Sequence, residues 1–131
     1  MNKNTQIEEL VKFNLWANKR LVKWLTSNDQ ELLREDCQSS FSSILETLQH
    51  IWDGEVFYFS ALLKRPIEKN SDSSIDGVYE GLIAQSKAFV EYLETQDTDA
   101  LDKSRPVKVK NLDGLFPQYE LIQHCMNHST F

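Results

Sequence analysis

Hydrophobic residues recur at intervals of three and four along three long stretches of the chain, the pattern of amphipathic helices. The first stretch, 5–26, contains no glycine or proline that would interrupt a helix. The second is expected to begin at a capping box formed by Ser43 and Glu46, or one turn earlier. It should end near Lys64, because Pro66 disfavours helical geometry in the residue before it.

The second half of the chain predicts a third long helix and a short fourth one. The polar segment 68–74 is expected to be a surface loop that leads into the third helix, from 75 to about 95. Residues 107–110 alternate between valine and lysine, so we expect a long loop or a small hairpin there. Pro117 favours the first turn of a last, short helix that runs to Phe131. The pattern therefore predicts an all-α protein, a four-helix bundle.

The two sides of the second helix differ in character. One side of a helical wheel collects large hydrophobic residues, which are predicted to face the core: Ile44, Leu48, Trp52, Val56, Phe59 and Leu63. His50 lies opposite, beside the small residues Gly54 and Ala61, which fits either a ligand site with room around it or a solvated histidine. The aromatic residues are predicted to pack in the core rather than around a cofactor: Phe13, Trp16, Trp24, Trp52, Phe57, Tyr58 and Phe59.

Composition narrows the class of protein. A chain of 131 residues, 40% of them hydrophobic, predicts a single domain over residues 1–131 that folds without a disulfide or structural metal. A net charge of −6 and the lack of a basic, aromatic window argue against nucleic acid as a partner. No signal sequence is visible, and no apolar run approaches the roughly 20 residues of a membrane span. Two distant cysteines, Cys37 and Cys125, fit a reducing compartment, so we expect a cytoplasmic protein without a membrane partner.

The three histidines are the residues that suggest chemistry. His124 and His128 stand four apart on the last predicted helix, where side chains project from one face, and His50 lies on the second. Imidazoles from two helices can hold a divalent metal and leave positions open for water or substrate. Asp53 and Glu55 are either acceptors that orient an imidazole or, as most helix charges are, solvated. Each histidine alone is more often a partly buried polar residue, so the metal site is a hypothesis.

Three segments together resemble the DinB-like family, whose members are four-helix bundles with a metal held by a histidine triad. They are FNLWANKRL at 13–21, SFSSILETLQHI at 40–51 and HCMNHST at 124–130, and the resemblance spans nearly the whole chain. It implies that His50 and His128 are metal ligands. In the family the last helix carries Asn-His-x-x-x-His-Arg-Gly, but this chain ends at Phe131, before the position of the final histidine. We therefore expect a shortened last helix, with His124 as a substitute or auxiliary ligand, or an incomplete site.

The resemblance implies a protein that binds a divalent metal (Zn, Ni, Fe or Mn), or one whose site stays without metal because it is incomplete. The enzyme hypothesis is a metal-dependent transferase that activates a low-molecular-weight thiol, since a bound ion lowers the pKa of a coordinated thiol or water. No catalytic residue and no organic cofactor can be named. The alternative is a non-catalytic, stress-related or ligand-binding bundle that acts as a homodimer. Association is expected because a short last helix leaves apolar surface uncovered.

Overall fold

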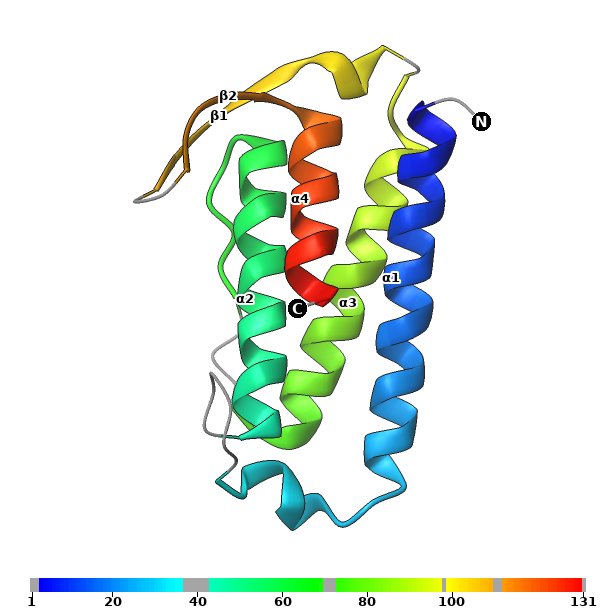
Figure 1. The fold of residues 1–131 in the computed structure, drawn as a ribbon, viewed down its shortest axis with the longest axis vertical. Helices are drawn as coiled ribbons and strands as arrows, with labels where there is room; N and C mark the ends of the chain where they lie inside the picture. The colour runs from blue at the N-terminus through cyan, green and yellow to red at the C-terminus, as the bar shows by residue number, and fades with distance from the viewer. Residues whose placement is uncertain (1–2, 37–42, 70–72, 98, 110–111, 131) are drawn as a thin grey trace.

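The computed structural model describes residues 3–36, 43–69, 73–97, 99–109 and 112–130. Its four α-helices are α1 (Lys3–Thr26), α2 (Ile44–Leu63), α3 (Ile75–Glu94) and α4 (Gln118–Thr130). Both α1 and α2 pack against α3 and against α4, so the four helices form a bundle (Figure 1). The short α4 lies between α1 and α2 and covers only part of their length (Figure 1). The predicted all-α four-helix bundle with a short last helix is confirmed.

Local signals set the ends of the long helices. Ser43 is the N-cap of α2, and its Oγ accepts a hydrogen bond from the backbone N–H of Glu46 at 3.1 Å. Ser74 caps α3 in the same way. The residue after α2 is Lys64, which adopts the left-handed conformation with φ 57° and lets the chain turn away before Pro66. The boundaries predicted for α2 and α3 are correct to within about one residue.

The expected small hairpin is present and lies across one end of α2 and α4 (Figure 1). Its antiparallel strands are β1 (Ser104–Val109) and β2 (Leu112–Pro117). Pro117 is the last residue of β2 rather than the first of α4, so that detail of the prediction is wrong. Two 3₁₀-helices too short to give a periodic signal complete the fold, η1 (Gln30–Arg34) and η2 (Ala100–Asp102).

The buried face of α2 is rotated relative to the predicted one. Leu48 and Trp52 are buried as expected, whereas Ile44 is 39% exposed. The buried positions of α2 are Leu45, Leu48, Trp52, Glu55, Tyr58 and Leu62. The helical wheel did not predict this face because Glu55, a charged residue, occupies a fully buried core position.

Three aromatic residues of α1 lie on the outside of the bundle. Phe13, Trp16 and Trp24 are 62%, 54% and 63% exposed, and Phe57 of α2 is 37% exposed, so their predicted core positions are wrong. The prediction holds for Trp52 and Tyr58, and Phe59 is half-buried. Asparagines take the inward positions of α1 and turn its aromatic side outward: Asn14 and Asn18.

Four buried polar side chains join α1, α2 and α3, and we call them the core polar network: Asn14, Asn18, Glu55 and Ser86. Ser86 Oγ donates to Glu55 Oε1 at 2.9 Å, and Asn18 Nδ2 donates to Ser86 Oγ at 2.9 Å. Asn14 and Asn18 each donate to one oxygen of the Glu55 carboxylate, at 3.3 and 3.4 Å. The buried carboxylate is therefore hydrogen-bonded from two other helices, as a charge in a core requires.

No helix in the described parts of the chain is both long enough and apolar enough to span a membrane.

Candidate metal centre

Two of the three histidines meet where α2 packs against α4. The ring centroids of His50 and His128 lie 4.7 Å apart, with the ring planes tilted by 45°. His50 is exposed and His128 is half-buried, so the pair stands at the rim of the helix interface. The structure thus brings together the two imidazoles that the sequence assigned to one site.

Gly54 makes room for this approach. It follows His50 by one turn on the same side of α2, and a Cβ atom built on it would lie 2.6 Å from Cε1 and 2.7 Å from Nδ1 of His128. Cβ atoms essentially never make contacts this short, so any larger residue at Gly54 would displace the ring. The small residue that the sequence placed beside His50 is therefore what admits His128.

His128 has the chemistry of a neutral nitrogen ligand. Burial lowers the pKa of its imidazole, and the nearby His50 and His124 lower it further. Its Nδ1 is buried and has no hydrogen-bond partner among the described residues. A neutral imidazole keeps a lone pair free for a metal, and an unsatisfied buried nitrogen costs about 1–3 kcal/mol. A metal, or a donor of another kind, would satisfy the site.

The ring of His124 contacts Tyr58. The ring centroid of Tyr58 is 5.6 Å from that of His124 and 6.4 Å from that of His128. Within the described residues, no group of three or more histidine, cysteine or acidic side chains is arranged to hold a metal ion. The structure brings His50 and His128 together, and the described side chains complete no triad around them.

The acidic and thiol residues nearby do not face the pair of imidazoles. Asp53 forms an ion pair with Lys69, whose ammonium also lies 4.3 Å from the ring centroid of Trp52. Glu55 belongs to the core polar network and is not solvated as expected. Cys125 is fully buried, and burial, with a smaller contribution from Glu55, raises the pKa of its thiol well above the ordinary value. Cys125 is therefore a packed thiol, whereas Cys37 lies outside the described residues.

Sequence reasoning missed two features around the centre. The core polar network was not anticipated, although the spacing of Asn14 and Asn18 by one helical turn signals a polar stripe on one face. Tyr58 was assigned to the core without its contacts to the histidines of α4, which depend on how the two helices pack.

Comparison with known proteins adds to the geometry. The sequence model of the DinB family matches residues 1–131. The chain is also similar to Protein DinB of Bacillus subtilis (strain 168), with 21% identity over 137 residues that cover 94% of this chain and 77% of that protein.

Proposed function

The chain belongs to the DinB family, and on that basis we propose that it binds a divalent metal ion through His50 and His128. The observation that carries the proposal is the approach of these two imidazoles, 4.7 Å between ring centroids, across two helices that are distant in sequence. Imidazole nitrogens suit Zn, Ni and Fe, and Mn is the weaker candidate because it prefers oxygen ligands. His124, one turn before His128 on α4, is an auxiliary ligand.

The activity that we propose is a metal-dependent transfer to or from a low-molecular-weight thiol. The chemistry that the metal supplies when bound is a lowered thiol pKa, which makes a thiolate available near pH 7. The chain itself positions the ligands. Gly54 fixes the place of the His128 ring, and the exposed position of His50 leaves the solvent side accessible to a small substrate.

Titration calorimetry with Zn²⁺ and Ni²⁺ on the metal-stripped chain tests metal binding. We expect His50→Ala and His128→Ala each to weaken the affinity at least about tenfold, which corresponds to about 1.4 kcal/mol. His124→Ala is the matched control on the same helix and should have a smaller effect. If His50→Ala leaves the affinity unchanged while His124→Ala abolishes it, the metal belongs to the pair on α4 and the proposed centre is wrong.

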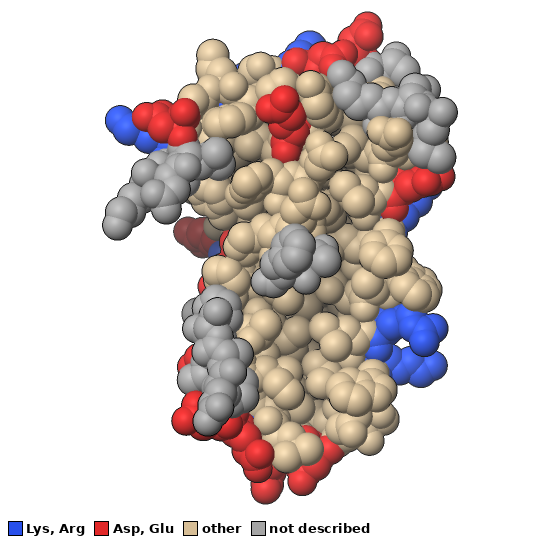
Figure 2. All heavy atoms as spheres, viewed as in Figure 1, with Lys and Arg blue, Asp and Glu red and all other residues tan. Residues whose placement is uncertain are grey.

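The outer face of α1 favours a second function, a non-catalytic stress-related or ligand-binding bundle that acts as a homodimer. Phe13 and Trp16 lie 5.6 Å apart between ring centroids, Arg20 stacks over Trp16, and Trp24 continues the stripe. At about 150–250 Å² per aromatic side chain, these three rings leave roughly 300–450 Å² uncovered, about half of one side of a standard interface. Figure 2 shows a broad area without charged residues below the end of α4 and beside α1.

Light scattering on the metal-stripped chain tests the homodimer. We expect a mass twice the 15.3 kDa of one chain, and a shift toward the monomer in a Trp16→Ser variant. Lys87→Ser, on the exposed surface of α3, is the control. A monomer mass at high protein concentration would refute this second function and would leave the proposal of metal binding unaffected.

A further inference from the structure

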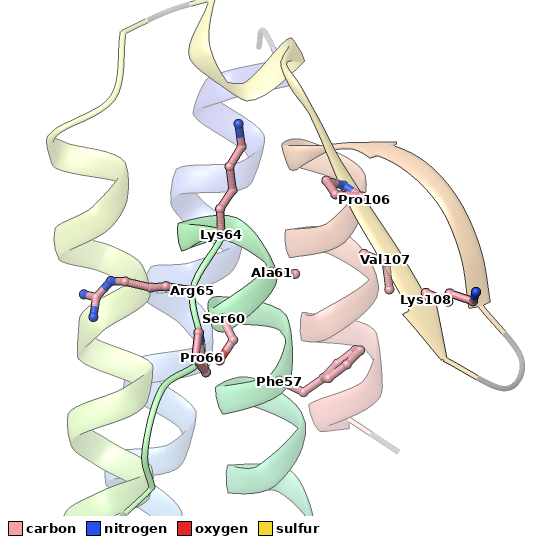
Figure 3. Close-up of a pocket in the computed structure, with 9 residues that line it drawn as sticks. All are labelled: Phe57, Ser60, Ala61, Lys64, Arg65, Pro66, Pro106, Val107 and Lys108. Atoms are coloured by element: carbon pink, nitrogen blue, oxygen red, sulfur yellow. The ribbon is translucent and has the colours of Figure 1, made fainter.

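A cavity of about 520 Å³ opens between the end of α2 and the hairpin (Figure 3). Its floor is formed by Phe57, Ser60 and Ala61 of α2, which share one side of the helix. Pro66 bounds it on one side, and Pro106 with Val107 of β1 bounds it on the other. The volume falls in the range of about 300–1,000 Å³ that is typical of small-molecule sites.

The walls of the cavity are apolar and held in place. Ser60 is the only uncharged polar side chain among the described residues that line it, and its hydroxyl donates to the carbonyl of Val56 within α2 at 2.8 Å. Arg105 fixes β1 to α2, because its Nε donates to the carbonyl of Leu62 at 2.9 Å. The two sides of the cavity therefore exist before any ligand binds.

Three cations stand at the rim of this apolar cavity: Lys64, Arg65 and Lys108. Figure 3 shows their side chains pointing outward from its edge rather than into it. All three are exposed, and none forms an ion pair with a described residue. No acidic residue occurs in 56–67 or 103–112, although the chain as a whole has a net charge of −6. Glu68, three residues after Arg65, is the acid nearest to these cations in sequence, and Asp113 lies opposite Lys108 in the hairpin register.

We propose that this cavity binds a small amphipathic anion, with a hydrocarbon body against Ala61 and Val107 and a carboxylate at the cationic rim. Charge complementarity selects this class of ligand, because an apolar floor alone would accept any hydrophobic molecule, whereas the unpaired cations favour an anionic head. The site is separate from the proposed metal centre. Phe57, the lining residue nearest to His50 in sequence, is seven residues beyond it, about 10 Å along α2.

Titration calorimetry with octanoate, in the presence of a chelator, tests the proposal, with octan-1-ol as the neutral probe of the same length. We expect octanoate to bind at least tenfold more tightly than octan-1-ol. The double variant Arg65→Glu, Lys108→Glu should remove this preference and leave the binding of octan-1-ol unchanged. Lys64 is left unchanged because it is the C-cap residue of α2. The double variant Lys12→Glu, Lys19→Glu, on the exposed side of α1, makes the same change in net charge and should keep the preference.

Filling the cavity gives an independent test. Ala61→Trp should reduce octanoate binding at least tenfold, whereas Ala84→Trp, at an exposed position of α3, should not. Nuclear Overhauser contacts between octanoate and the ring of Phe57 in the unaltered chain locate the ligand without any substitution. Equal binding of the two probes, unchanged binding in Ala61→Trp, or contacts to other residues instead of Phe57 would each overturn the proposal. Because the chelator removes metal, failure here leaves the proposed metal centre untouched.

Discussion

Replacing Gly54 by alanine should separate metal binding from the stability of the fold. The added Cβ would lie 2.6 Å from Cε1 of His128, so the ring must move. His128 is half-buried and stands close to the described end of α4, at Thr130. Its ring can therefore swing away, and in doing so it leaves His50.

The two expected effects have opposite signs. Alanine is favoured over glycine by about 0.8–1 kcal/mol inside a helix, so the free energy of unfolding of the metal-free chain should stay constant or rise by up to about 1 kcal/mol. Zn²⁺ affinity should fall at least tenfold, about 1.4 kcal/mol, because one of two imidazoles leaves the site.

Gly81→Ala is the matched control. A Cβ there would lie 2.1 Å from Cζ2 of Trp52, whose side chain is only 4% exposed, so the buried ring must shift. Overpacking costs about 1–3 kcal/mol, and the same gain in helix propensity offsets part of it. We expect a net loss of roughly 0–2 kcal/mol in unfolding free energy and unchanged affinity for Zn²⁺.

Urea unfolding followed by circular dichroism in chelator measures the stability, and calorimetry on the folded chains measures the affinity. The reasoning fails if Gly54→Ala binds Zn²⁺ as tightly as the unaltered chain. It also fails if Gly81→Ala loses affinity to the same extent, because the loss would then reflect a general loosening of the bundle.

Further expectations concern the core, the pH response and the buried thiol. Leu48→Ala should cost about 2–5 kcal/mol in urea unfolding, since Leu48 is 2% exposed and its loss leaves a cavity; a cost below about 1 kcal/mol would contradict its core position. The pKa of His128 is lower in the folded state than its ordinary value of 6.5, so the unfolded chain binds more protons between these two values. The contribution of His128 to the unfolding free energy of the metal-free chain should therefore be fully present above about pH 6.5 and fall as the pH drops toward the folded pKa. His128→Asn should flatten this pH dependence in urea unfolding between pH 5 and 8. An unchanged slope would assign the pH dependence to other groups. In a Cys37→Ser chain, Cys125 should react with a disulfide reagent about 100-fold more slowly than in urea, and equal rates would show that the thiol is accessible.

The ends of the helices were predictable because their causes are local. Ser43 caps α2 through a contact three residues away, and Pro66 acts on its immediate neighbours. The rotation of the helices was not predictable in the same way. Asn14, Asn18 and Glu55 occupy core positions only because each finds a partner on another helix, and a helical wheel has no information about that partner.

At the candidate metal centre, too, local features were predictable from the sequence and contacts between distant segments were not. The family resemblance pointed to His50 and His128, and the small residue Gly54 beside His50 was visible in the sequence. The contact of His124 with Tyr58 depends on the packing of α4 against α2, which brings together residues distant in sequence. The cavity at the hairpin depends likewise on Arg105 binding the end of α2, 43 residues away in sequence.

The core polar network explains why α2 presents His50 to α4. Successive residues of a helix are about 100° apart, so Gly54 points to α4 only while the neighbouring Glu55 points into the core. A rotation of α2 by one residue would take the Glu55 carboxylate away from Asn18 and Ser86 and leave these buried side chains without their acceptor, at a cost of about 1–3 kcal/mol for each unsatisfied group. A hydrophobic residue at position 55 would penalise such a rotation less, because apolar contacts are not directional. Glu55, the charged residue that the hydrophobic pattern of α2 did not place in the core, thus sets which face of α2 carries the histidine pair.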